Sequence, residues 1–158
     1  MKVFISGSRS IKKFNEDIEK ELFNELNYSS HILVGDANGV DDIVQQFCAS
    51  RRYKNLTVYA MNKPRNNRGN FQTKIFSSNR KGRGFYTEKD IIMTNNADFG
   101  IVIWDGKSKG SLDNIDRLIK QNKICKVYSM ESQKWFMVES KNCLKNSEKN
   151  VVQKSLFL

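Results

Sequence analysis

The chain has 158 residues and a formal net charge of +10 at pH 7. This length suits one compact domain with one core. No apolar run is long enough to cross a bilayer, and the N-terminal MKVFISGSRS lacks the apolar stretch of a signal peptide. Cys48, Cys125 and Cys143 are far apart, and the chain has one histidine, which argues against a disulfide framework and a structural zinc site. We expect a cytoplasmic protein with no metal, no cofactor and no membrane partner.

Five short runs rich in valine and isoleucine predict β-strands at 2–6, 31–35, 56–61, 99–104 and 124–129. The runs are nearly continuous, which is typical of a parallel sheet buried on both faces. Apolar residues at helical spacing predict helices over 14–26, 40–53, 87–96 and 111–121. This alternation implies right-handed βαβ units. We therefore predict an α/β fold: a Rossmann-like, doubly wound, mainly parallel sheet of about five strands with helices on both faces.

Two stretches fall outside this alternation. Residues 62–86 hold the sole proline and three glycines, and we expect an irregular segment there, either functional or disordered. Near the end, Trp135, Phe136 and Val138 indicate a short strand or a packed edge. The predicted organisation is one domain over 1–130 and a C-terminal extension over 131–158 that packs on the same domain or trails from it.

The positive charge is concentrated along the chain. Residues 62–89 contain eight lysines and arginines against Glu88 alone, so seven of the ten net charges lie in this stretch. The basic residues are Lys63, Arg65, Arg68, Lys74, Arg80, Lys81, Arg83 and Lys89. A basic segment binds nucleic acid or a phosphorylated small molecule, or it is a solvated loop.

The loop after the first predicted strand contains Gly7, Ser8 and Arg9. Small residues let backbone N–H groups approach an anion, and an arginine binds a phosphate or carboxylate in a bidentate manner. A tight turn with a surface arginine has the same appearance.

The loop after the second predicted strand contains Gly35, Asp36, Gly39, Asp41 and Asp42, and it opens a helix. Glycines permit backbone conformations closed to other residues, and the helix N-terminus adds a partial positive charge. Asp41 and Asp42 either face a ligand or complement the helix dipole. Asp36 follows the strand directly, so we expect it to accept hydrogen bonds from sugar hydroxyls or an amine.

The loop after the fourth predicted strand also precedes a helix with an inward apolar face. A strand–loop–helix element rich in glycines and hydroxyls suits a phosphate. The candidate ligand residues are Asp105, Gly106, Lys107, Ser108, Gly110 and Ser111, with Lys109 beside them. Neither GxxxxGK[ST] nor GxGxxG is present. Both lysines contact an anion or are solvated, and Trp104 before the loop lies in the core or borders the pocket.

These motifs resemble the SLOG superfamily, which includes the Lonely Guy phosphoribohydrolases and the DNA-processing protein A domain. The resemblance covers residues 1–129 and is closest to the YspA-like branch. It implies that Gly106 to Ser111 corresponds to the family's phosphate loop, with Ser111 in place of a threonine. It also implies that Lys89, in Lys89-Asp90-Ile91-Ile92-Met93, fills a basic ligand position.

The chain departs from the Lonely Guy pattern at the residue used for bond cleavage. Those enzymes carry a glutamate where this chain has Asn114, and an amide cannot act as a base or stabilise an oxocarbenium-like transition state. At the basic position, Lys89 keeps the charge of the family's arginine without its bidentate geometry. Asp113 is adjacent, yet on a helix it points about 100° away. The resemblance therefore supports ligand binding more than hydrolysis.

Three functions follow from these residues. The first is binding of a nucleotide or nucleotide-derived ligand by a sensor, carrier or sequestering protein, with segment 62–89 folded over the ligand and Phe85 or Tyr86 stacked on a base. The second is a nucleotide N-glycoside hydrolase or ribosyl transferase, with Asp36, Asp105 or Asp113 replacing the absent glutamate. The third is nucleic-acid binding through the basic segment. The resemblance also implies a homo-oligomer, because SLOG relatives often pair through helices.

Overall fold

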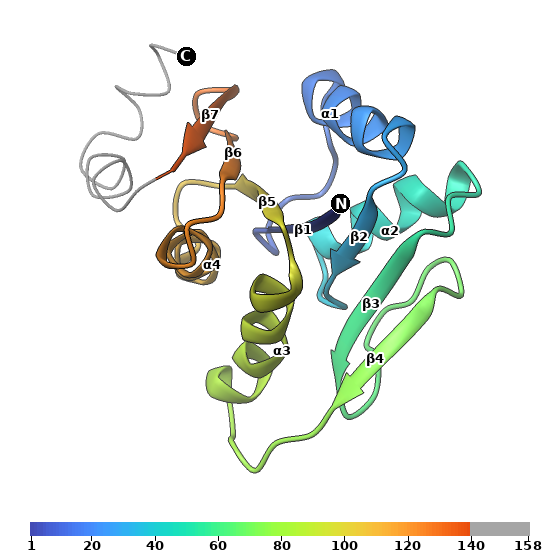
Figure 1. Cartoon of the computed structure of the whole chain (residues 1–158), viewed down its shortest axis with the longest axis vertical. Helices are drawn as coiled ribbons and strands as arrows, with labels where there is room; N and C mark the ends of the chain where they lie inside the picture. The colour runs from blue at the N-terminus through green and yellow to red at the C-terminus, as the bar shows by residue number, and fades with distance from the viewer. Residues whose placement is uncertain (140–158) are drawn as a thin grey trace.

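The computed structural model describes residues 1–139, which form one seven-stranded sheet with four helices (Figure 1). The strand order is β4-β3-β2-β1-β5-β6-β7, and only β6 and β7 pair antiparallel. The strands are β1 (Lys2–Gly7), β2 (His31–Val34), β3 (Leu56–Met61), β4 (Gln72–Phe76), β5 (Phe99–Trp104), β6 (Cys125–Ser129) and β7 (Lys134–Val138). The predicted α/β fold with a mainly parallel sheet is confirmed.

Helices cover both faces of the sheet, as expected. The helices are α1 (Glu16–Asn27), α2 (Val40–Ser50), α3 (Arg83–Asn96) and α4 (Lys109–Lys120). Because side chains alternate along a strand, β1 sends Val3 and Ile5 into a core with α1 and α2, and Phe4 into a core with α3 and α4. Each helix therefore buries its apolar stripe against the sheet, and the loops at the strand ends stay free to form a site.

The five predicted strands are present, and the sheet gains a strand at each edge. One of them, β4, lies inside the stretch 62–86 that we expected to be irregular. Its sequence QTKIF has no buried residue, because β4 is an edge strand that pairs with β3 alone. A strand with so little apolar burial carries no strong hydrophobic pattern. The other, β7, lies where a short strand or packed edge was predicted.

The helix starts differ from the predictions by a few residues. Helix α1 begins at Glu16, because the side chain of Asn15 accepts a hydrogen bond from the Ile18 amide at 3.0 Å. Helix α3 begins at Arg83, four residues before the predicted start, after Gly82 at a φ of +62°. The earlier start of α3 places Arg83 and Tyr86 on a helix rather than in a loop.

The topology fixes where a ligand site can form. From β1 the chain builds the sheet outward to β4, then returns to the other side of β1 to form β5 (Figure 1). In open α/β sheets, ligands bind beyond the carboxyl ends of the strands where the winding direction reverses. In this sheet that switch point lies between β1 and β5, which pair in parallel from Val3 to Gly7.

The predicted C-terminal extension begins within this same sheet, since β7 pairs with β6. The remainder of the extension, residues 140–158, including Cys143, lies outside the described residues. Cys48 and Cys125 are buried and free. Within residues 1–139, no helix combines the length and apolarity needed to span a membrane.

Candidate functional site

A pocket of about 440 Å³ opens at the switch point, between the facing sides of α3 and α4 and beside the end of β1. We call it the switch-point pocket. Phe4 and Met93, both buried, supply its apolar part. Most of its other lining side chains are polar or charged, which suits a ligand that carries charged and hydrogen-bonding groups.

Half of the predicted ligand residues line this pocket. Those on its wall are Gly7, Arg9, Asp41, Lys89, Ser108, Gly110 and Ser111. Those off its wall are Ser8, Gly35, Asp36, Gly39, Asp105, Gly106 and Lys107. The three loops expected to converge therefore do converge, but several of their residues shape the backbone behind the pocket.

Gly7 and Ser8 join the end of β1 to the end of β5. The Ser8 amide donates to the Ile103 carbonyl at 3.0 Å, and the buried Ser8 hydroxyl accepts from the Asp105 amide at 3.0 Å. A Cβ on Gly7 would lie 2.2 Å from the Ile103 carbonyl oxygen and 2.5 Å from a Val40 methyl. Only glycine fits there, so the loop can pass close enough for its backbone to border the pocket.

Gly39 permits the tight entry into α2. Its φ is +82°, and a Cβ there would lie 2.5 Å from the Arg9 Cα. The first two loops therefore pack backbone against backbone. This packing holds Arg9 at the pocket rim, where it is exposed and makes no side-chain hydrogen bond or ion pair with the described residues.

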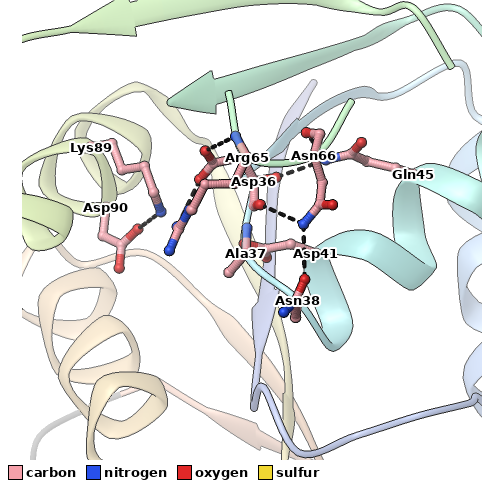
Figure 2. Close-up of polar contacts among 10 residues, drawn as sticks. Asp36, Ala37, Asn38, Asp41, Gln45, Arg65, Asn66, Lys89 and Asp90 are labelled. Carbon is pink, nitrogen blue, oxygen red and sulfur yellow. Dashed lines mark hydrogen bonds and ion pairs between the residues drawn. The ribbon is translucent and has the colours of Figure 1, made fainter. Parts of the chain in front are cut away.

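Asp41 and Lys89 meet at the inner wall of the pocket, and both are more than nine-tenths buried. A Cβ on Gly35 would lie 2.4 Å from Asp41 Oδ2 and 2.9 Å from Lys89 Nζ, so both side chains crowd the space that this glycine leaves open. Lys89 Nζ also pairs with Asp90 Oδ1 at 2.8 Å (Figure 2). The predicted role of Gly35 as a ligand contact becomes a role in making room for these two charges.

Burial raises the pKa of Asp41 from 3.8 to about 6. Nearby Asp90 and Asp36 also raise this pKa, whereas Lys89 and the Ala37 amide, which donates to Asp41 at 3.1 Å, lower it. The pKa of Lys89 is raised, because attraction to Asp90 and Asp41 outweighs the desolvation that lowers it. The pocket thus holds a carboxylate that titrates near neutral pH beside a lysine that stays charged.

Asp36 does not face the pocket, contrary to its expected role toward a sugar. It is 1% exposed and accepts from the Arg65 amide and from Arg65 Nη2, both at 2.8 Å (Figure 2). Asn66 donates to the Asp36 carbonyl at 2.9 Å. Asp36 therefore anchors the segment after β3 over the end of β2, and its carboxylate is already occupied. The carboxylate that faces the pocket from this loop is Asp41.

The third loop is organised by Asp105, which also lies off the pocket wall. Its Oδ1 accepts from the amides of Lys107 and Ser108, and its Oδ2 accepts from the Ser10 hydroxyl. Burial opposes ionisation of Asp105, but these hydrogen bonds prevail and lower its pKa to about 2. Gly106, at a φ of +89°, completes the turn. Asp105 is therefore a structural carboxylate that presents the start of α4.

The two lysines of this loop, Lys107 and Lys109, are exposed and lie off the pocket wall. Trp104 is 5% exposed and donates from Nε1 to the Ser108 carbonyl at 3.1 Å, so it belongs to the core. His31, at the start of β2, bonds Asn55 and Thr57 and does not line the pocket, so its role is structural. The loop contributes backbone and hydroxyl groups rather than cations.

The N-termini of α3 and α4 border the pocket, and first-turn acids do not neutralise the partial positive charge of these helix starts. Gly82 and Arg83 line it from α3, and Ser108, Gly110 and Ser111 line it from α4. Neither helix has a side-chain cap or an acidic residue in its first turn. By contrast, α1 has a side-chain cap and three acidic residues in its first turn. The unpaired amides of a helix start carry partial positive charge, so both helices favour an anion.

Residues on the facing sides of α3 and α4 complete the lining. Sequence reasoning named Tyr86 but missed Asp90 and Arg117 on these helices, and it also missed Ser6 on β1. A signal for Arg117 exists: Ser111, Asn114 and Arg117 recur every three residues, a polar stripe beside the apolar one. Asn114 and Ser111 are each 3% exposed and line the pocket, so this stripe faces inward rather than toward solvent.

Most of the basic segment is neutralised by acids brought close in the fold. Five of its eight cations form ion pairs, a point that the linear charge count could not show. The pairs are Arg65–Asp36, Arg68–Asp42, Arg80–Glu88, Arg83–Asp113 and Lys89–Asp90. The segment therefore offers less free positive charge to a nucleic acid than its sequence indicated. Asp113, the third candidate for catalysis, lines the pocket but is paired with Arg83 at 2.6 Å.

No protein-family model and no curated protein matches this chain. The features that indicate a function belong to the pocket itself. The pocket lies at the switch point, it is bordered by two helix starts without side-chain caps, and its inner wall holds buried Asp41 and Lys89.

Proposed function

We propose that the chain binds a nucleotide or nucleotide-derived phosphorylated ligand in the switch-point pocket, as a sensor, carrier or sequestering protein. The observation that carries the proposal is the wall formed by α4. There Ser108, Gly110 and Ser111 line a pocket of about 440 Å³ at the start of a helix that has neither a cap nor a first-turn carboxylate. Such a helix start binds phosphate oxygens through its amides and hydroxyls.

The wall opposite α4 suits the donor groups of a nucleoside. Asp41 lines the pocket from the start of α2 and is ionised for the most part at pH 7, since its pKa is about 6. A carboxylate accepts hydrogen bonds from ribose hydroxyls or an exocyclic amine, and it repels phosphate. The pocket is therefore polarised, with phosphate at α4 and the sugar or base toward Asp41.

Tyr86 offers a stacking surface at the mouth of the pocket. It is 41% exposed, and the Arg65 guanidinium lies 4.2 Å from its ring centroid. An aromatic ring held by a cation on one side can stack on a base with its free surface. Phe85, the other expected stacking residue, contacts the Tyr86 ring but does not line the pocket.

Membership of the SLOG superfamily is part of this proposal and rests on the loop motifs and on their convergence at one pocket. A cytoplasmic location and a homo-oligomeric state remain predictions from the sequence.

The proposal is tested by isothermal titration with AMP, GMP, CMP and UMP and with the four corresponding nucleosides. We expect micromolar binding of at least one nucleotide, and at least tenfold weaker binding of its nucleoside, because charged hydrogen bonds to phosphate contribute about 1.5–3 kcal/mol each. Equal affinity for a nucleotide and its nucleoside, or no binding across the panel, would refute it.

A second function, N-glycoside hydrolysis or ribosyl transfer, is favoured by one observation. Asp41 is a buried pocket carboxylate with a pKa of about 6, a value suited to a general base near neutral pH. For this second function we therefore propose Asp41 as the candidate carboxylate, in place of Asp36, Asp105 and Asp113. Chromatography of the incubated nucleotides decides: a free base released by the native chain and not by Asp41→Asn supports hydrolysis, and intact nucleotides refute it.

A further inference from the structure

Arg117 is a pocket cation with no acidic partner among residues 1–139. Among residues 1–139, five cations line the switch-point pocket, and three of them are ion-paired: Arg65, Arg83 and Lys89. Arg9 and Arg117 form no ion pair with the described residues. Arg9 lies on an exposed loop, whereas Arg117 is half-buried on α4. Within the part of the chain that the structure describes, Arg117 is therefore the pocket cation that a helix holds without an ion-pair partner.

Asn114 holds Arg117 in place without cancelling its charge. Arg117 Nη1 donates to Asn114 Oδ1 at 2.6 Å, and Asn114 Nδ2 donates to Ser6 Oγ at 3.2 Å. Asn114 is 3% exposed, so this relay from β1 to Arg117 is fixed in the interior. A carboxylate of the same shape at residue 114 would form a buried ion pair with Arg117 and neutralise it. The amide gives the same orientation and leaves the positive charge available.

The position of Arg117 brings its guanidinium toward the start of α4. Side chains on a helix lean toward its N-terminus, and the bond to Asn114 fixes Arg117 over the preceding turn. Ser111 lies one further turn back and lines the same pocket. The guanidinium and the first amides of α4 therefore act on the same region of the pocket.

We propose that Arg117 binds the phosphate of the ligand and that Asn114 is its positioning residue, an amide that leaves the charge of Arg117 uncompensated. This inference rests on the proposed function and deepens it, since it adds a phosphate contact and gives Asn114 a role in binding. The anion is bound from two sides: by the helix start and by a guanidinium that can engage two phosphate oxygens.

The test uses four single variants of the full chain: Asn114→Asp, Asn114→Ala, Arg117→Gln and the control Asn24→Asp. Asn24 is exposed on α1, which packs on the opposite face of the sheet, so its change adds the same charge away from the pocket. Binding of inorganic phosphate and of the tightest-binding of AMP, GMP, CMP and UMP is measured by isothermal titration, with Tm recorded for each variant.

We expect Asn114→Asp and Arg117→Gln to weaken binding of both probes by about 10- to 100-fold, Asn114→Ala to weaken it less, and Asn24→Asp to leave it unchanged. This order separates a positioning role from a packing role. If Asn114 only packed, Asn114→Asp would keep native affinity because its shape is conserved, and Asn114→Ala would be the most damaging change. That result would overturn the inference.

The experiment also separates the inference from the proposed function. If the native chain binds a nucleotide and both Asn114→Asp and Arg117→Gln bind it equally well, the inference fails and the proposed function stands. If the native chain binds neither probe, both fail. If Arg117→Gln does not fold, Arg117→Lys takes its place. It keeps the charge but not the bidentate fork, so it should bind more weakly than the native chain and more tightly than Asn114→Asp.

Discussion

Asp41→Asn should stabilise the protein at neutral pH and weaken its function. Asp41 is 8% exposed, and burial raises its pKa from 3.8 to about 6. It faces one cation, Lys89, and two other carboxylates, Asp90 and Asp36. A buried carboxylate that costs stability and yet lines a pocket is the kind of residue expected at a binding site.

The direction in which pH changes the stability follows from proton binding at Asp41. Between pH 3.8 and about 6 the folded chain holds a proton on Asp41 that the unfolded chain has released, so the stability contributed by this group falls as pH rises through that interval. Each unit of pKa shift corresponds to about 1.4 kcal/mol, so the loss reaches about 3 kcal/mol above pH 6. The Asp41→Asn variant lacks this titration, so it should be more stable than the native chain at pH 8 by up to about 3 kcal/mol.

Urea unfolding of the native chain and of Asp41→Asn at pH 4, 6 and 8 measures this difference. The two stabilities should converge at pH 4 and diverge at pH 8. The affinity for the nucleotide should fall in the variant because Asp41 is the proposed contact of its sugar or base. Asp42→Asn is the matched control. Asp42 is more exposed and pairs with Arg68, so its removal should destabilise by about 1 kcal/mol or less. A stability difference for Asp41→Asn that is negative or independent of pH would refute the reasoning.

Three further predictions follow from the loops. Asp105→Asn should destabilise the folded protein by about 1–2 kcal/mol at pH 7, since the pKa of Asp105 is about 2 and solvent screens part of the effect. Urea unfolding should show this loss of stability shrinking as pH falls from 3.8 toward 2. An equal loss at every pH would contradict this prediction. Among residues 1–139, a Cβ at Gly110 would meet no atom within 4 Å outside its chain neighbours and the backbone of α4, so Gly110→Ala should keep or raise Tm while titration shows weaker nucleotide binding. Unchanged affinity would show that no ligand approaches there. Tyr86→Ala should weaken nucleotide binding about tenfold or more and leave inorganic phosphate unaffected, whereas Tyr86→Phe should bind as the native chain does.

The fold was predictable where a strand is buried on both faces, because such a strand has a nearly continuous apolar run in the sequence. The runs 2–6 and 99–104 are nearly continuous because β1 and β5 are covered on both faces, and each was found close to its predicted bounds. The segment 72–76 was missed, because an edge strand with one neighbour needs little apolar sequence. The predicted five strands therefore became seven by additions at the edges, where pattern is weakest.

The site was predictable at the level of loops and less so at the level of side chains. Gly7 and Gly39 lie where two backbone segments approach closely, and glycines in the loops after predicted strands are visible in the sequence. Whether a carboxylate faces the pocket depends on its partners, and a partner such as Arg65 for Asp36 lies far along the chain. The same reason explains why the free positive charge of residues 62–89 could not be judged from the sequence. Most of the ion-paired cations in this segment contact acids from other elements. Arg117 was missed because the polar stripe of Ser111, Asn114 and Arg117 looks the same in the sequence as the solvated face of a helix.

The central claim is that phosphate binds at the start of α4. Backbone amide NMR of the isotope-labelled chain, titrated with the tightest-binding nucleoside 5′-monophosphate and then with its nucleoside, tests it most directly. We predict the largest shift changes at Gly110 and Ser111, with changes at Gly7 and none at Asn24, and we predict that the nucleoside leaves Gly110 and Ser111 nearly unmoved. Shift changes that bypass the start of α4, or that the nucleoside reproduces in full, would contradict the account.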